Sequence, residues 1–207
     1  MTSETRNADL RSTSLLTSEF FCRDPLACAR ELIGCEMVWQ GCGGVIVETE
    51  AYSVCNDEAC HTFARPSSRD FVTRSQPGSA YVYLNYGVRW LFNFLVKGGR
   101  KDGFVLIRAL EPTTGLDAMT LRRNTARLEN LCSGPGKLTR ALDISGQHHG
   151  ADFLGNKKFA LRAPAGAISV VVGHRIGITK SMELPWRFTL EGSRFLSVKN
   201  PPSVIDR

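Results

Sequence analysis

The alternation of apolar and polar positions along the chain predicts short strands joined by turns, with helices inserted in blocks. Helical signals are a capping residue, an early proline or a 3.6-residue apolar period, and they occur over 24–34, 56–59, 114–127 and 133–142. Strand signals are short apolar runs bounded by turn residues, and they occur over 36–40, 45–50, 80–86, 89–96, 104–110, 167–172, 175–179 and 186–190. Residues 41–44 are expected to be a turn, and residues 65–78 an arginine-containing loop.

This order of elements favours an α+β fold: one antiparallel or mixed β-sheet with helices packed around it. Residues 1–17 are rich in Ser, Thr and Arg without periodicity, so we expect a flexible N-terminal arm there. The remainder, 18–207, is expected to form a single domain, because 207 residues suffice for one sizeable core.

Composition changes this picture only modestly. The net charge of +6 and the pI near 9.1 are compatible with a polyanionic partner such as nucleic acid, without requiring one. Seven cysteines and no secretory signal favour a reduced, intracellular setting: cytoplasm or nucleoid in a bacterium, the nucleus in a eukaryote. No apolar run approaches the roughly 20 residues of a membrane helix, so no membrane partner is expected.

The first candidate for chemistry is the strand end that carries Glu48 and Glu50, followed by Tyr52 and His61. The two-residue period of a strand places Ile46, Glu48 and Glu50 on one face, so both carboxylates could lie in one pocket. A carboxylate beside apolar walls can accept a proton from water. A solvated strand-edge glutamate is the plain alternative. An acid/base pair for O-glycoside hydrolysis is another, but this spacing alone sets no catalytic separation.

The second candidate is the run SAYVYLNYG at 79–87. Tyr81 and Tyr83 alternate onto one face, and Tyr86 falls at a turn before Gly87. Core packing explains such tyrosines in many proteins. The functional interpretation is a stacking wall for a planar base, with a ring at the turn that can enter a duplex as a wedge.

Two further motifs could bind anions. Arg108 interrupts an apolar strand and needs an anionic partner, either a carboxylate of the chain or a substrate phosphate. In CSGPGKL, Gly134, Gly136 and Lys137 form a plausible phosphate seat at a helix start, although a plain helix cap explains them equally well. Cys55, Cys60 and His61 lack a second ligand pair at zinc-site spacing, so no metal is expected.

Together these motifs resemble the alkyladenine (3-methyladenine) DNA glycosylase family. The ordered set is VETEAY, D-E-A-x-H, P-G-x-x-Y-V-Y-x-x-Y-G, R-A-L-E-P, S-G-P-x-K-L and R-I-G-I, and it runs from about residue 20 to 198. The resemblance implies a monofunctional enzyme of base-excision repair that needs no cofactor. Its expected partner is double-stranded DNA containing damaged purines, and we expect a monomer.

The resemblance also implies roles for single residues. Glu50 matches the general base that activates water, and Tyr52 and His61 match the rings that hold the flipped base. Tyr83 and Asn93 match residues of the pocket, Asn93 being the amide that disfavours guanine. Other matches are Arg108 near the phosphate of the flipped nucleotide and Tyr86 as the ring inserted into the duplex.

The basic residues Arg65, Arg69, Arg74 and Lys137 are expected to contact the DNA backbone. The resemblance implies alkylated purines of the 3-methyladenine and 7-methylguanine type as substrates. Residues 87–92 depart from the family pattern at Arg89 and Trp90, so the full range of accepted bases, particularly neutral ones such as hypoxanthine and ethenoadenine, stays open. Two other classes compete with the glycosylase: a non-catalytic DNA-binding module and a purine nucleosidase.

Overall fold

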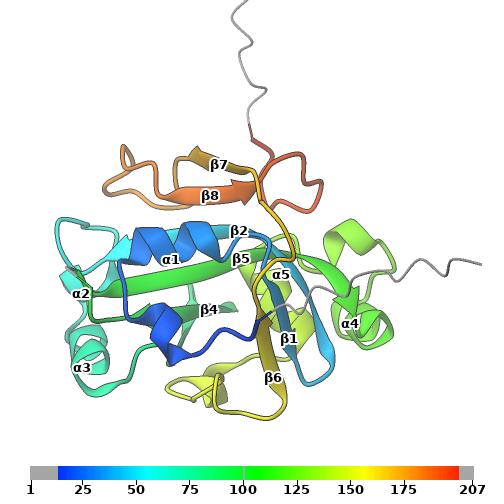
Figure 1. Ribbon diagram of the computed structural model, residues 1–207, viewed down its shortest axis with the longest axis horizontal. Helices are drawn as coiled ribbons and strands as arrows, with labels where there is room; N and C mark the ends of the chain where they lie inside the picture. The colour runs from blue at the N-terminus through cyan, green and yellow to red at the C-terminus, as the bar shows by residue number, and fades with distance from the viewer. Residues whose placement is uncertain (1–13, 100, 201–207) are drawn as a thin grey trace, which may run out of the picture.

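Within residues 14–99 and 101–200, which the computed structural model describes, the strands form one eight-stranded sheet in which every pairing is antiparallel (Figure 1). The order is β3–β4–β5–β2–β1–β6, with β8 beside the second half of β2 and β7 beside β8. The strands are β1 (Glu36–Trp39), β2 (Cys42–Ser53), β3 (Ala80–Asn85), β4 (Arg89–Val96), β5 (Gly103–Thr114), β6 (Phe159–Arg162), β7 (Val170–Gly173) and β8 (Arg187–Leu190).

The helices lie around this sheet, as the α+β expectation requires, and confirm the fold class (Figure 1). They are α1 (Pro25–Glu31), α2 (His61–Ala64), α3 (Pro66–Arg74), α4 (Leu116–Arg123) and α5 (Pro135–Leu142), with 3₁₀ turns η1 (Ser18–Phe21), η2 (Leu128–Asn130) and η3 (Gly146–His148). Helix α1 begins as the sequence predicts, because the Asp24 side chain accepts a hydrogen bond from the Leu26 amide and Pro25 occupies the first turn.

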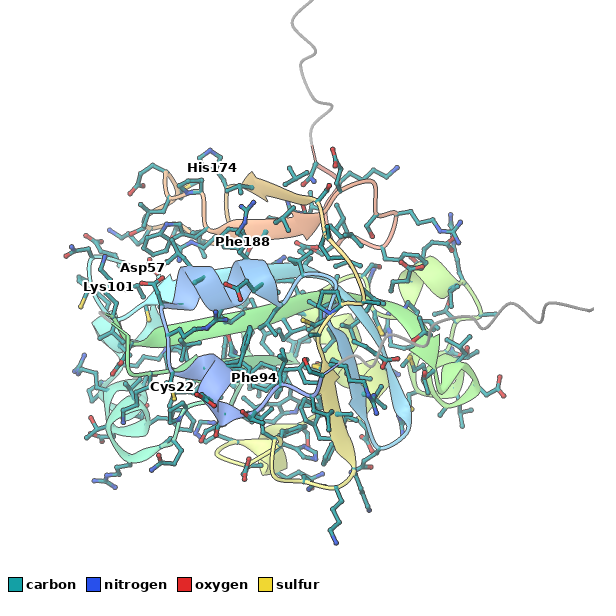
Figure 2. The ribbon with its side chains drawn as sticks, in the orientation of Figure 1. Cys22, Asp57, Phe94, Lys101, His174 and Phe188 are labelled. Atoms are coloured by element: carbon teal, nitrogen blue, oxygen red, sulfur yellow. The ribbon has the colours of Figure 1, made fainter. Side chains whose placement is uncertain are left out.

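The two faces of the central strands have different environments because side chains alternate along each strand. One face, which we call the core face, packs into the main hydrophobic core together with α1 and α5; Phe92, Phe94, Val105 and Ile107 belong to it. In Figure 2, Phe94 lies in the middle of the molecule. The opposite face carries tyrosines, arginine and carboxylates, and we call it the cavity face. Helix α3 covers one end of the cavity face, where Phe71 and Val72 pack near Tyr81.

Several boundaries differ from the sequence expectations. Residues 65–78 are not a loop, because Pro66 starts α3 and its Val72 is buried in a small second core. Residues 56–59 are not a helix, and the helix begins at His61 instead. Residues 175–179 are bends and irregular backbone rather than a strand, and β6 has no counterpart among the predicted strands. The helix expected to extend to residue 127 ends at Arg123.

The tight turn between β1 and β2 is Gln40–Gly41, whose positive φ angles of 49° and 77° suit a two-residue hairpin. The predicted turn at 41–44 is therefore wrong: Gly43 and Gly44 lie within β2, where a side chain at either would collide with backbone of β1 or β5. Of the expected arm 1–17, residues 1–13 lie outside the described residues. Leu16 donates its amide to the Leu161 carbonyl at 2.8 Å, beside β6. Within the described residues, no helix is long and apolar enough to cross a bilayer.

Candidate active site

A cluster of buried charges lies on the cavity face of β2 and β5. Glu48 and Glu50 have no exposed surface, and both carboxylates bind the Arg108 guanidinium. The Glu48 Oε1–Arg108 Nε distance is 3.0 Å and the Glu50 Oε2–Arg108 Nη1 distance is 3.1 Å. The two carboxylates thus meet in one buried cluster, as the strand pattern suggests, and the prediction that they share a pocket stays a prediction. Of the two anionic partners considered for Arg108, the structure supplies the carboxylate, and a phosphate contact stays a prediction.

Ile46 does not share the face of the two glutamates, contrary to the strict two-residue period. It packs into the main core, because the pairing of β2 with β5 shifts register on both sides of Glu48. Such a bulge changes the side on which the following residues point. Beyond it the alternation resumes: Thr49 reaches the Ala29 carbonyl of α1 on the core face, and Glu50 reaches Arg108 on the cavity face.

The carboxylate of Glu50 is held by three donors. The Ile176 amide donates to Oε1 at 2.7 Å, and the Tyr52 hydroxyl donates to Oε2 at 2.8 Å, beside Arg108. Burial and the nearby Glu50 charge raise the pKa of Tyr52 well above its ordinary value, so this phenol keeps its proton and remains a donor. A carboxylate has about four acceptor positions, so one remains for a water or a substrate group.

Glu48 is engaged more completely. Its Oε1 also accepts from Arg187 Nε at 2.8 Å and from the Ser197 hydroxyl at 2.7 Å, and its Oε2 accepts from the Ser197 amide at 2.6 Å. Burial acts to raise the pKa of Glu48, but Arg108 and Arg187 outweigh it and hold the pKa below its ordinary value. Glu48 therefore supports Arg108, Arg187 and the chain near Ser197, with one more donor than Glu50 has.

An open cavity of about 880 Å³ lies beside this cluster and brings together most of the predicted site residues. Its lining includes Tyr52, His61, Arg65, Tyr83, Tyr86, Asn93, Arg108, Gly134, Gly136 and Lys137. Glu50 itself lies directly behind this surface, since its partners Tyr52, Arg108 and Ile176 all line the cavity.

Aromatic rings form one wall of the cavity. The centroids of His61 and Tyr83 are 4.3 Å apart, and those of Tyr81 and Tyr83 are 5.6 Å apart. The expectation that Tyr81 and Tyr83 share a face is confirmed, since both line the cavity. Asn93 lies opposite Tyr81 on the neighbouring strand and donates Nδ2 to the Tyr81 carbonyl at 3.0 Å, which fixes its carboxamide.

His61 is tuned to stay neutral. Its Nδ1 is 2.9 Å from the Tyr81 hydroxyl, which is itself 2.7 Å from the Ser68 hydroxyl. Burial, together with the positive charge of Arg65, lowers the pKa of His61 to about 4. At neutral pH this wall of the cavity therefore presents an uncharged imidazole.

Tyr86 stands at the tip of the β3–β4 hairpin. Its side chain is 88% exposed, and its φ of 49° is in the left-handed region, which bulky residues seldom adopt. The neighbouring Val88 is also exposed, at 74%. The turn therefore exposes two large side chains, of which Tyr86 lines the cavity, and strained backbone of this kind is often found at functional sites.

Positive charges surround the cavity mouth. Arg65 and Lys137 line it, and so does Arg89, which sequence reasoning did not assign. The stem of Arg89 lies against Gly136, where any side chain would collide with it. Among the described residues, the Arg89 guanidinium has no carboxylate within salt-bridge distance. Trp90 points away from the cavity and packs against Gly146, as the alternation along β4 requires.

Two of the predicted basic residues do not line the cavity. Arg69 donates Nη1 to the Thr62 carbonyl at 2.7 Å and so holds the end of α2, and Arg74 is the last residue of α3. Sequence reasoning also missed Ser197 and the amide of Ile176. For Ile176 a signal existed in the R-I-G-I motif, whereas Ser197 had none. Within the described residues, no group of three or more His, Cys, Asp or Glu side chains could hold a metal ion.

Comparison with known proteins gives a consistent result. The family model of methylpurine-DNA glycosylase matches residues 19–194. A protein of Agrobacterium fabrum is 47% identical over 88% of this chain and 92% of its own length. A protein of Rhizobium johnstonii is 45% identical over 95% of this chain and 98% of its own. Both are provisionally named 3-methyladenine DNA glycosylases. The match spans β1 to β8 and every residue of the charged cluster except Ser197, and the chain therefore belongs to the methylpurine-DNA glycosylase family.

Proposed function

We propose that this protein is a monofunctional DNA glycosylase that removes alkylated purines of the 3-methyladenine and 7-methylguanine type from duplex DNA and leaves an abasic site. The observation that carries the proposal is Glu50, a buried carboxylate with one open acceptor position behind an aromatic cavity. Family membership and the names of the relatives support the same reaction.

The chemical step requires a base for water more than a strong acid. A water held by Glu50 attacks C1′ of the damaged nucleotide and gives its proton to the carboxylate. The bond from C1′ to the purine nitrogen breaks, and its electron pair goes to the departing base. A purine alkylated at N3 or N7 carries a positive charge, so it leaves as a neutral molecule. Arg108, Tyr52 and the Ile176 amide hold the carboxylate in one position during this transfer.

The cavity suits a purine that has left the helix. Tyr52, His61 and Tyr83 offer ring surfaces, and stacking on such rings contributes on the order of 1–3 kcal/mol per base. This offsets part of the few kcal/mol that unstacking requires, a cost that is lowest for damaged or mispaired sites. The neutral imidazole of His61 adds no repulsion toward a cationic base. Asn93, whose carboxamide is held by the Tyr81 carbonyl, lines the cavity, and its proposed role is to disfavour unmodified guanine.

Duplex DNA fits the surroundings better than a free nucleoside. Tyr86, exposed at the tip of the β3–β4 hairpin, would fill the space that the extruded base vacates, and Arg65, Arg89 and Lys137 would contact phosphates around it. Gly134 and Gly136 allow backbone to approach a phosphate at the start of α5. A purine nucleosidase would need neither the exposed wedge nor the basic rim.

The deciding experiment measures abasic-site formation in duplexes that each contain one lesion: 3-methyladenine, 7-methylguanine, hypoxanthine or ethenoadenine. Free methylated purine nucleosides serve as the comparison. We expect excision from the alkylated duplexes and none from the nucleosides. Cleavage of nucleosides alone would favour the nucleosidase, and lesion-specific binding without excision would favour the non-catalytic module.

A further inference from the structure

A second buried ion pair lies just outside the cavity, between two segments far apart in the sequence. Asp57 lies in the turn before α2, and Arg175 lies in the segment between β7 and β8. The pair is bidentate: the Arg175 Nη1–Asp57 Oδ2 distance is 2.7 Å and the Nη2–Oδ1 distance is 2.8 Å. Both side chains are fully buried. Figure 2 labels Asp57 and His174, the neighbour of Arg175, on adjacent segments at the same end of the molecule.

Asp57 fixes the backbone that leads to His61. Its Oδ2 accepts from the Ser53 amide and its Oδ1 from the Ala59 amide, both at 3.1 Å. Its own carbonyl accepts from the Cys60 amide at 3.0 Å. These bonds set the path of the chain between the end of β2 and the start of α2, and so the place from which the His61 ring enters the cavity.

Arg175 fixes the position of Tyr52 and of the chain next to Glu50. Its guanidinium lies over the Tyr52 ring, 4.7 Å from the centroid, and it also donates to the Ala51 carbonyl at 3.0 Å. The next residue, Ile176, donates its amide to Glu50. A shift of Arg175 would therefore move a ring of the cavity and one of the three donors that orient the Glu50 carboxylate.

Stability alone is a weak reason for such a pair. Apolar side chains of similar volume are often as stabilising as a buried ion pair, because two charges must be desolvated. Arg175 Nε is also buried without a hydrogen-bond partner among the described residues, which is a further cost. Neither Asp57 nor Arg175 lines the cavity, so neither can contact the substrate base.

We propose that Asp57 and Arg175 are positioning residues, which hold His61, Tyr52 and the Glu50–Ile176 contact in register for base excision. The proposal rests on the proposed glycosylase function. A misplacement of about 1 Å at a reacting group can lower a rate by about 10²-fold, so the pair can be essential to the rate without touching the substrate.

The test uses Asp57→Asn, Arg175→Gln and Arg175→Lys. Single-turnover excision is measured at saturating enzyme on a duplex with one 7-methylguanine, beside the affinity for undamaged duplex and the melting temperature. We expect the Asn and Gln variants to excise at least tenfold more slowly and to bind undamaged duplex within twofold of the parent. Arg175→Lys keeps the charge but loses the bidentate geometry. Its excision rate should therefore lie between the rate of the parent and that of Arg175→Gln.

The matched control is Thr49→Val. Thr49 is buried in β2, the strand that carries Glu50, but its hydroxyl donates to the Ala29 carbonyl on the core face, away from the cavity. It should lose stability and keep the parent rate within twofold. A single substitution leaves one buried charge unpaired, so the single variants can fail to fold. In that case the double variant Asp57→Asn/Arg175→Gln, which has neither charge, is measured instead. If the double variant also fails to fold, the rate of Arg175→Lys decides. Folded variants that excise at the parent rate overturn the proposal. A parent protein that excises nothing refutes the glycosylase function instead.

Discussion

Replacing Glu48 by glutamine removes the negative charge from a buried carboxylate that accepts four hydrogen bonds, while keeping the size of the side chain. The amide oxygen of glutamine can take the place of Oε1 and accept from Arg108, Arg187 and the Ser197 hydroxyl. Its amino group then faces the Ser197 amide, so two donors meet. Arg187, which is 5% exposed, loses its charged partner and keeps only neutral acceptors: the glutamine oxygen and the Asn200 and Val198 oxygens.

Breaking a buried ion pair by removal of one partner costs about 3–5 kcal/mol, because the remaining charge is left without compensation. We therefore expect Glu48→Gln to lower the free energy of unfolding by at least about 3 kcal/mol at pH 7. This is a large part of the roughly 5–15 kcal/mol that a domain of this kind has. Urea denaturation followed by tryptophan fluorescence measures it through the shift of the midpoint.

The comparison variant is Glu36→Gln, which breaks a surface pair. Glu36 Oε2 lies 3.1 Å from Arg162 Nη1, but both side chains are about 40% exposed, so the cost should stay below about 1 kcal/mol. The pKa of Glu48 is lowered in the folded protein, so its contribution is present above pH 4.5 and is lost as the pH falls below that value. The difference between parent and Glu48→Gln should shrink in the same range. Equal costs for Glu48→Gln and Glu36→Gln would refute the assigned role of the cluster.

Three other perturbations test separate parts of the site. Tyr86→Ala should leave the melting temperature unchanged, because the ring is exposed. It should weaken binding to a duplex with one lesion by about tenfold relative to undamaged duplex. Equal losses of affinity for both duplexes would exclude the wedge role. The pKa of His61 falls from 6.5 in the unfolded chain to about 4 in the folded protein, so the parent should lose stability as the pH drops from 6.5 to 4. In urea denaturation, His61→Gln should lose less stability over this range. An identical dependence of unfolding free energy on pH in both proteins would contradict the lowered pKa. Arg89→Gln should reduce the slope of log affinity for duplex against log salt concentration by about one, the value for one phosphate contact. Arg30→Gln on α1 should leave this slope unchanged. An unaltered slope for Arg89→Gln would exclude the phosphate contact.

Local signals in the sequence predict the parts of the fold that depend on neighbouring residues. The cap at Asp24 and the alternation of β3 and β4 are of this kind, and the structure confirms both. Pro66 starts a helix that its few apolar residues did not reveal, because the second core that buries Val72 is built from distant strands. Residues 175–179 have a strand-like pattern, but the amide of Ile176 is bound by Glu50 rather than by a neighbouring strand.

For the site as well, local sequence signals predict some residues, and the rest depend on contacts between distant segments. Motif order and strand alternation place Tyr52, Tyr83 and Arg108 correctly at one cavity. The bulge at Glu48 depends on how β2 pairs with β5, and a single strand contains no signal for it. The ion pair of Asp57 with Arg175 joins positions 118 residues apart, so only the folded chain brings them together.

The most direct test of the account concerns Glu50. Glu50→Gln keeps the size of the side chain but cannot take a proton from water, so single-turnover excision of 7-methylguanine from duplex DNA should fall by about 10²-fold or more, the usual scale of general-base catalysis. Binding to the same duplex should persist, which shows that the variant is folded. A Glu50→Gln protein that binds the lesion and excises it at the parent rate would contradict the central claim that this carboxylate activates the water.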